Sequence, residues 1–243
     1  MVGLILAAGK GSRFSSDGKS GVCKALLEVG GVPLISYSLN NLLRLGVTRA
    51  VIVIGPQHHN IIETLGDRFC GMELQYVEQV QPIGLASAML CAKDLIDEDV
   101  VLQLSDEVFL DPVPAEDLLA AFSSADFAVG YTIDRAENIR RNFSVETDAE
   151  ERILRCTEKP TEIVNDRKGT GFCIFSAACY ALLKHDYNAE TNQPGDLCDF
   201  INDLIRCGKR GIAVPVAAEE ININTAQELL YARRQTAQRG RLS

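Results

Sequence analysis

The chain opens with Val2-Gly3-Leu4-Ile5-Leu6-Ala7-Ala8-Gly9-Lys10-Gly11-Ser12-Arg13, and this stretch decides the fold. Its first part, from Val2 to Leu6, is a short apolar run that ends in small residues and glycine. Such a run is typical of a buried parallel strand that leads into a loop. The sequence therefore predicts a strand, a glycine-rich loop and a helix, in that order.

Strands and helices alternate in the same way through the first half of the chain. Predicted strands cover residues 2–6, 50–54, 74–77 and 100–104, and predicted helices cover residues 34–45, 60–65 and 84–95. Strands that alternate with helices of about ten residues indicate right-handed βαβ units. We therefore expect an α/β fold: a Rossmann-like, mostly parallel sheet flanked by helices on both faces.

The second half of the chain is less regular. Its predicted strands cover residues 127–133, 143–147, 169–175 and 213–216, its predicted helices cover residues 197–207 and 226–234, and residues 134–141 are expected to form a surface connection. The sequence contains no internal repeat and no Pro/Ser-rich linker. We therefore expect a single domain over residues 1–232, followed by a flexible tail at residues 233–243.

The composition limits the classes of partner. The 243 residues are 47% hydrophobic, which is ample for a buried core. A net charge of −9 without clustered Lys and Arg argues against a nucleic-acid partner. No apolar run is long enough to span a membrane, and the start lacks a signal-peptide pattern. We expect a cytoplasmic protein with no membrane partner. The sequence does not decide whether it forms a homo-oligomer.

The cysteine and histidine pattern offers no metal motif. The eight cysteines form no Cys-x-x-Cys pair and do not alternate with the three histidines, His58, His59 and His185. This pattern argues against both a zinc site and a disulfide framework. We expect the cysteines to be small, reduced hydrophobic residues.

The glycine-rich loop has the chemistry of a phosphate site. Gly9 and Gly11 lack a Cβ, so phosphate oxygens can approach the backbone N–H groups, and Arg13 adds a planar charged fork. The dinucleotide-binding fingerprint is absent because Phe14 stands where its third glycine would be, and the P-loop pattern is absent too. The loop alone thus predicts a bound phosphate and does not identify the ligand.

The string Leu6 to Arg13, followed by Lys24-Ala25-Leu26-Leu27, closely resembles the motif of the sugar-1-phosphate nucleotidyltransferases. The wider superfamily includes cytidylyltransferases that act on non-sugar phosphates. The resemblance implies a GT-A-like nucleotidyltransferase fold that binds an NTP and Mg²⁺. The nucleotide-binding residues it implies are Leu6, Ala7, Ala8, Gly9, Gly11, Ser12, Arg13, Gln79, Pro82, Gly84 and Ser105.

Gln79 and the segment from Pro82 to Ala86 resemble the family segment that reads the base. In the family a glutamine contacts the pyrimidine edge, and a glycine lets the base approach the backbone. The resemblance thus implies that Gln79 and Gly84 select a pyrimidine, without separating UTP, dTTP and CTP. As an alternative, Gly84 serves only as a helix cap.

Asp106 matches the magnesium-binding aspartate of the family. It follows an apolar strand, and open α/β sheets bind ligands at the carboxyl ends of their strands. The second metal segment of the family normally carries an aspartate, but here it contains Asn222 and Asn224, of which we slightly prefer Asn222. The alternatives are a helix cap at Asp106 and an Asx turn at either asparagine.

The acceptor residues implied by the resemblance lie in the second half. Glu158-Lys159-Pro160 matches a family segment in which the glutamate binds acceptor hydroxyls and the lysine contacts the acceptor phosphate. Gly171 falls where relatives have a glycine that lines the acceptor pocket. The chain departs from sugar-specific relatives in the segment Asn142-Phe143-Ser144-Val145, where they usually carry a Tyr-Gly pair.

The resemblance implies that residues 1–110 mainly bind nucleotide and residues 111–232 mainly bind acceptor. It predicts transfer of a nucleotidyl group from a pyrimidine NTP to a sugar 1-phosphate, with Arg13, Lys24 and Lys159 as the catalytic cations. Because Tyr-Gly is missing, the alternative is a cytidylyltransferase for a non-sugar phosphate or phosphonate. Because both metal-segment candidates are asparagines, a non-catalytic regulatory relative that only binds nucleotide also stays open.

Overall fold

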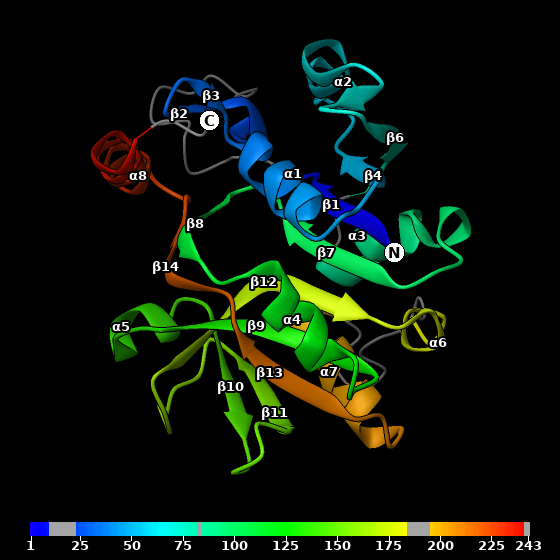
Figure 1. The fold of residues 1–243 in the computed structure, drawn as a ribbon, viewed down its shortest axis with the longest axis vertical. Coiled ribbons are helices and arrows are strands. Elements are labelled where there is room, and N and C mark those ends of the chain that lie inside the picture. The colour runs from blue at the N-terminus through cyan, green and yellow to red at the C-terminus, as the bar shows by residue number, and fades with distance from the viewer. Residues whose placement is uncertain (10–22, 82–83, 184–194, 241–243) are drawn as a thin grey trace.

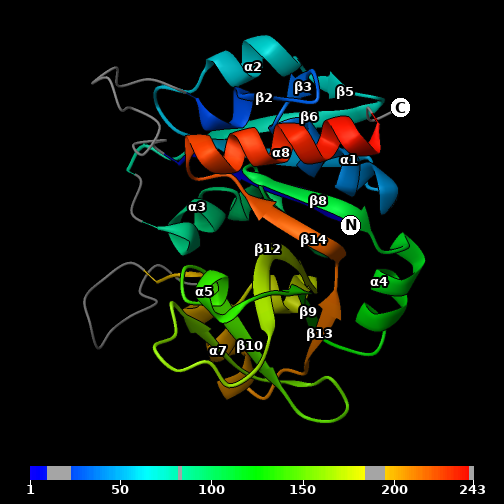
Figure 2. The same cartoon turned by 90° about the vertical axis from the view of Figure 1, so that its left-hand side faces the viewer.

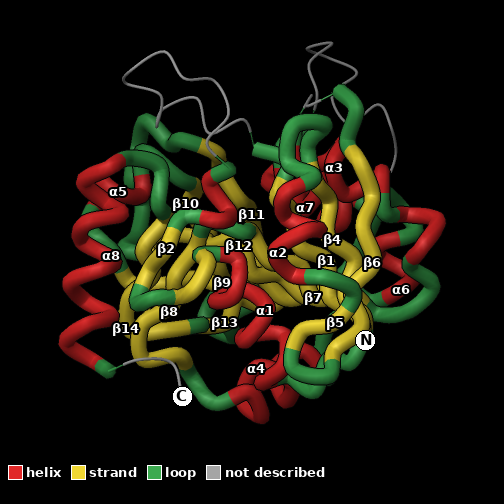
Figure 3. The backbone as a smooth tube through the Cα atoms, turned by 90° about the horizontal axis from the view of Figure 1, so that it is seen from above, coloured by secondary structure: helices red, strands yellow, loops and turns green. Residues whose placement is uncertain are grey.

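A computed structural model describes residues 1–9, 23–81, 84–183 and 195–240. Most strands join one central sheet with helices on both sides (Figures 1 and 3). This sheet contains β1 (Val2–Ala7), β4 (Arg49–Ile54), β5 (Arg68–Phe69), β6 (Met72–Glu78), β7 (Val100–Leu104), β9 (Phe127–Ile133), β10 (Phe143–Thr147), β11 (Ile153–Glu158), β12 (Arg167–Phe175) and β13 (Gly211–Pro215). The predicted α/β fold class is confirmed.

The first half of the chain builds the parallel part of the sheet, in the order β7-β1-β4-β6. Strand β1 lies between β7 and β4, and all six of its residues are buried, so both of its faces are covered. Successive side chains of a strand point to opposite faces. Leu4 therefore joins one hydrophobic cluster and Ile5 joins the other.

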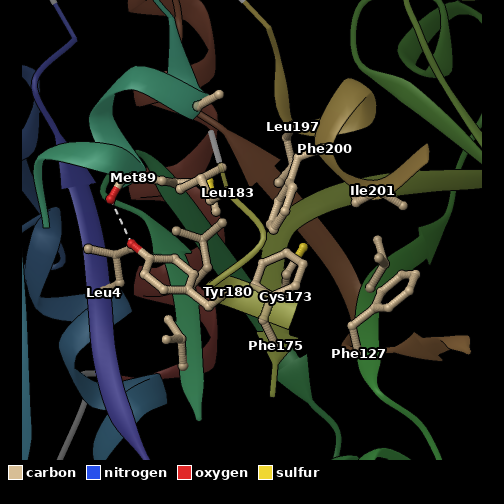
Figure 4. Close-up of a cluster of buried hydrophobic side chains, with 14 of the residues drawn as sticks. Leu4, Met89, Phe127, Cys173, Phe175, Tyr180, Leu183, Leu197, Phe200 and Ile201 are labelled. Atoms are coloured by element: carbon tan, nitrogen blue, oxygen red, sulfur yellow. Dashed lines mark hydrogen bonds between the residues drawn. The ribbon is translucent and has the colours of Figure 1, made fainter. Parts of the chain in front are cut away.

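Helices complete these two clusters. On the face of Leu4 lie α3 (Leu85–Cys91), α6 (Ala177–Tyr180) and α7 (Leu197–Arg206), and on the face of Ile5 lie α1 (Ile35–Arg44), α2 (Asn60–Leu65) and α4 (Ala115–Phe122). Figure 4 shows the first cluster, where the Tyr180 hydroxyl donates to the Met89 carbonyl at 2.6 Å. Among the described residues, no helix is long and apolar enough to cross a membrane.

Strand β12 joins the two halves of the molecule. It pairs antiparallel with β7 of the first half and with β9 and β10 of the second. A separate pair, β8 (Glu107–Pro112) with β14 (Ala217–Asn222), lies beside α8 (Ala226–Arg239) (Figure 2). The remaining elements are η2 (Lys24–Leu26), β2 (Glu28–Val29), β3 (Val32–Pro33), η3 (Lys93–Leu95) and α5 (Ala136–Ile139).

The structure corrects several predicted elements of the second half. Strands β8, β11 and β14 and helices α4 and α6 were not predicted, and the surface connection at 134–141 contains α5. The expected tail at 233–243 is wrong up to Arg239, because α8 continues that far. Thr236 is buried, and Arg239 forms an ion pair with Asp111, so tertiary contacts stabilise the last turns.

Candidate active site

The first cavity lies at the carboxyl ends of the parallel strands and has a volume of about 360 Å³. It contains seven of the residues predicted to bind nucleotide, together with both Lys24 and Asp106. Its lining consists of Leu6, Ala7, Ala8, Gly9, Lys24, Ala25, Gln79, Gly84, Leu85, Ala88, Leu104, Ser105 and Asp106. The predicted residues Gly11, Ser12, Arg13 and Pro82 lie outside the described residues.

Small side chains and exposed backbone at the end of β1 shape one wall of this cavity. His58, to which sequence reasoning gave no role, is buried beneath this wall, with its Nδ1 3.3 Å from the Ala7 carbonyl. A Cβ on Gly55 would come within 3.3 Å of the Ala8 carbonyl, so this packing is close. His58 and Gly55 therefore pack against Ala7 and Ala8 at the end of β1.

Gln79 and Gly84 lie next to each other in the lining of this cavity. The Gln79 side chain is buried, and its Nε2 donates to the Gly84 carbonyl at 3.3 Å. Gly84 precedes α3 with a φ of +107°, a backbone conformation that favours glycine. It therefore acts as a helix cap and lines the cavity as well, so the two interpretations of this glycine are compatible.

A charged centre forms where three distant segments meet. The Lys24 Nζ donates to Asp106 Oδ2 at 2.5 Å and to Asn224 Oδ1 at 2.8 Å. Asp106 follows β7, Asn224 follows β14, and the Ile223 N–H donates to the Asp106 carbonyl at 2.9 Å. Two hard oxygen ligands thus converge on one point that holds a cationic group.

Of the two candidate asparagines, the structure brings Asn224 to Asp106. Asn222 instead accepts a hydrogen bond at its Oδ1 from Asn224 Nδ2, at 2.7 Å. The Asn224 backbone N–H donates to Glu228 Oε2 at 2.7 Å, at the start of α8. The geometry therefore favours Asn224 over Asn222 as the residue that faces a cation.

A second, larger cavity of about 1100 Å³ begins on the other side of this centre. Asn142, Lys159, Asn222 and Asn224 all line it. The first cavity contains Lys24 and Asp106, so the Lys24–Asn224 hydrogen bond joins residues from the two cavities. The arrangement can hold two ligands that meet at one cationic point.

The predicted acceptor residues are only partly brought together. Lys159 follows β11 with a φ of +43°; its N–H donates to the Asn142 carbonyl at 2.7 Å and its Nζ lies 3.1 Å from Glu158 Oε1. Burial raises the pKa of Glu158, although Lys159 opposes this shift. Gly171 lines neither cavity: its N–H donates to Glu107 Oε1 at 2.7 Å, and Leu104 leaves no room for a Cβ.

A buried ionic cluster close to the second metal segment was not predicted. Lys168 is almost fully buried and pairs with Asp134 at 2.5 Å and Glu220 at 2.8 Å. Glu107 is also buried, with its Oε2 lacking a hydrogen-bond partner. The signal in the sequence was weak, because a lysine or glutamate next to apolar residues is usually solvent-exposed.

The side chains able to bind a metal ion are few around Asp106 in the described residues. None of these residues forms a group of three or more His, Cys, Asp or Glu side chains able to hold a metal ion. The donor set of Asp106 and Asn224 is therefore one carboxylate and one amide oxygen. This set fits a small hard cation such as Mg²⁺, which usually keeps several water ligands and binds substrate phosphates.

Comparisons with known proteins identify relatives of the chain. A nucleotidyltransferase of low-salt glycan biosynthesis from Haloferax volcanii, Agl11, is 30% identical to the chain over 213 residues. The alignment covers 86% of this chain but 58% of that relative. The UTP–glucose-1-phosphate uridylyltransferase AglF from the same organism is 29% identical, with 94% of this chain and 93% of AglF covered.

A solved structure shares the fold. UDP-glucose pyrophosphorylase in complex with UDP-glucose matches with a TM-score of 0.83 and 18% identity, over 98% of this chain and 99% of the other. The family model described as "Nucleotidyl transferase" matches residues 2–219. The resemblance that the motifs indicated is thus confirmed, and the chain belongs to the nucleotidyl transferase family.

Proposed function

We propose that the chain transfers a nucleotidyl group from a pyrimidine NTP to the phosphate of a sugar 1-phosphate. The products would be an NDP-sugar and pyrophosphate. One observation carries the proposal: Lys24 Nζ lies between Asp106 and Asn224, at the point where two cavities meet. The name of AglF, a uridylyltransferase for glucose 1-phosphate, supports the same class of substrates.

The proposed reaction requires no general base. An acceptor phosphate oxygen, already ionised near neutral pH, would attack the α-phosphorus of the NTP. A new P–O bond forms, and the bond from the α-phosphorus to the oxygen bridging to the β-phosphorus breaks, which releases pyrophosphate. Catalysis would therefore consist of alignment and stabilisation of negative charge.

The residues of the chain would share this work between the two cavities. Gln79 and Gly84 would hold the base in the first cavity. Lys24 would offset negative charge on the transferred phosphoryl group, and Lys159 would hold the acceptor phosphate. Arg13, outside the described residues, would assist Lys24 at the triphosphate.

We propose Mg²⁺ as the cofactor, held by Asp106 and Asn224. The two side-chain oxygens converge on Lys24 Nζ, a point that already suits a positive charge. Mg²⁺ bound there would neutralise charge at the α-phosphate and help to orient it. Since Asn224 is neutral, the site would hold the ion with one protein charge, from Asp106.

A pyrophosphate-release screen tests the proposal. UTP, dTTP, CTP, ATP and GTP would each be combined with phosphorylated sugars, phosphocholine and phosphonates, and the products would be identified by mass. We expect turnover with a pyrimidine NTP and a sugar 1-phosphate. Turnover only with CTP and a non-sugar acceptor would replace this proposal by the cytidylyltransferase alternative, which the missing Tyr-Gly pair in residues 142–145 favours. Tight NTP binding without any product would indicate a regulatory relative.

A further inference from the structure

Three asparagine amides form a chain that ends at the charged centre. Asn142 Nδ2 donates to the Asn138 carbonyl at 3.0 Å, and Asn222 Nδ2 donates to Asn142 Oδ1 at 3.4 Å. Asn224 Nδ2 then donates to Asn222 Oδ1 at 2.7 Å, and Asn224 Oδ1 accepts from Lys24 Nζ at 2.8 Å. The chain connects the last turn of α5 to the point beside Asp106.

The direction of this chain is fixed by its first link. A backbone carbonyl only accepts hydrogen bonds, so Asn142 must present its NH₂ group to Asn138 and its oxygen to Asn222. Asn222 must then turn its NH₂ toward Asn142 and its oxygen toward Asn224. Reversing a single amide would place two donors or two acceptors against each other.

The last amide therefore turns its oxygen toward the charged centre. An asparagine offers a cation an oxygen on one side and an NH₂ group on the other, and only the oxygen can bind it. A carboxylate has no such requirement, because both of its oxygens are ligands. In this chain the second metal segment contains asparagines, so the orientation of the amide matters.

We propose that Asn142 is a positioning residue which, through Asn222, orients the Asn224 amide so that its oxygen faces the cation beside Asp106. This inference rests on the proposed function. The backbone carbonyl of Asn142 also accepts the hydrogen bond from the Lys159 backbone N–H, so the backbones of these two residues are joined.

The test measures Mn²⁺ binding, with Mn²⁺ as a paramagnetic substitute for Mg²⁺, in the presence of UTP and without acceptor. Asn142→Leu removes the acceptor for Asn222 and should weaken Mn²⁺ binding about tenfold or more, the usual cost of losing a group that orients a ligand. Asn142→Asp keeps an acceptor there and should stay within about twofold of the unmodified protein.

Asn138 supplies the matched control. It lines the same cavity, but its side chain donates to Asp134, and only its backbone carbonyl belongs to the chain of amides. Asn138→Leu should leave Mn²⁺ binding within about twofold of the unmodified protein. Equal losses in Asn142→Asp and Asn142→Leu would overturn the proposal, because they would indicate a general packing defect. Mn²⁺ uptake that does not depend on Asp106, judged with Asp106→Ala, would also overturn it.

A double-mutant cycle isolates the orientation effect. With Asn224→Asp, either oxygen can face the cation, so adding Asn142→Leu should no longer weaken Mn²⁺ binding. An equal loss in both backgrounds would contradict the proposal. The outcome is separate from the fate of the proposed function: the screen can fail while the Mn²⁺ pattern holds, and the Mn²⁺ pattern can fail while pyrophosphate is released.

Discussion

Two lysines of this molecule are bound in similar ways in different surroundings. Lys24 and Lys168 each pair with a carboxylate from a distant strand, at 2.5 Å. Lys24 is 13% exposed on the wall of a cavity, whereas Lys168 is 4% exposed and its second partner, Glu220, is 1% exposed. Lys168, Asp134 and Glu220 line the second cavity, but Lys168 is more deeply buried than Lys24, so the ion pair of Lys24 is the more open to exchange with a ligand. The same chemical pair thus serves a site in one place and joins strands in the other.

The pKa shifts around Lys168 agree with this structural role. Burial would lower the pKa of Lys168, but Glu220 and Asp134 outweigh it and raise that pKa. Burial would raise the pKa of Asp134, but the hydrogen bonds from Lys168 and Asn138 lower it. Lys168 lies on β12, Asp134 follows β9, and Glu220 lies on β14, so one ammonium group connects three segments.

The largest effect should come from Lys168→Met. The substitution leaves Asp134 and Glu220 buried without their cation, which should reduce the free energy of unfolding by about 3–5 kcal/mol. Chemical denaturation monitored by circular dichroism would measure the loss. Lys209→Met is the control, because Lys209 forms a long 3.9 Å pair at a more exposed site and should change stability little. A stable but inactive Lys168→Met protein would erase the contrast between the two lysines.

Lys24→Ala should have the opposite effect, with a large loss of turnover and a small change in stability. We expect turnover to fall about 100-fold or more, the scale for removing one preorganised charge stabiliser, which corresponds to about 2.7 kcal/mol of activation free energy. Stability should change much less, because Asp106 remains accessible to water from the cavity. Steady-state pyrophosphate release and thermal unfolding would be measured together, with Lys209→Ala as the matched lysine control. Near-normal turnover would remove Lys24 from the mechanism.

Much of the parallel half could be predicted from the sequence. Strands such as β4 and β7 consist mostly of apolar residues, and helix α2 has the predicted bounds. The second half was harder because β8, β11 and β14 mix apolar and charged residues. These strands are fixed by partners far away in the sequence, which local patterns do not record.

The residues of the candidate site also differ in how far the sequence could predict them. Motif resemblance selected Lys24, Asp106 and the pair Asn222 and Asn224, with a slight preference for Asn222, and the structure places Lys24 within hydrogen-bond distance of Asp106 and Asn224. It could not reveal that Asn222 and Asn142 support Asn224, because that role depends on side-chain orientation across separate strands. Gly171 shows the converse. The resemblance assigned it to the acceptor pocket, but in the structure its backbone packs closely against the Leu104 side chain.

Glu107 sharpens the comparison further, because it follows Asp106 directly but is buried like Lys168. Burial raises its pKa well above the usual carboxyl range, and the nearby Glu220 and Asp106 carboxylates add to this shift. Between the usual carboxyl pKa and this raised value, the folded protein binds more protons than the unfolded chain. Its stability should therefore fall as the pH rises through that window.

Glu107→Gln should remove this dependence of stability on pH and change the stability near pH 5 little. Glutamine keeps the acceptor for the Gly171 N–H and stays neutral at every pH. We expect similar thermal midpoints for the variant and the unmodified protein near pH 5, and a variant more stable by about 2–4 °C near pH 8, the scale of about 1 kcal/mol in a chain of this size. A difference that stays constant with pH would mean that Glu107 is ionised in the folded protein. In that case the Glu107 carboxylate, next to Asp106, would belong to the charged centre with Lys24. The two lysines would then no longer lie in separate environments.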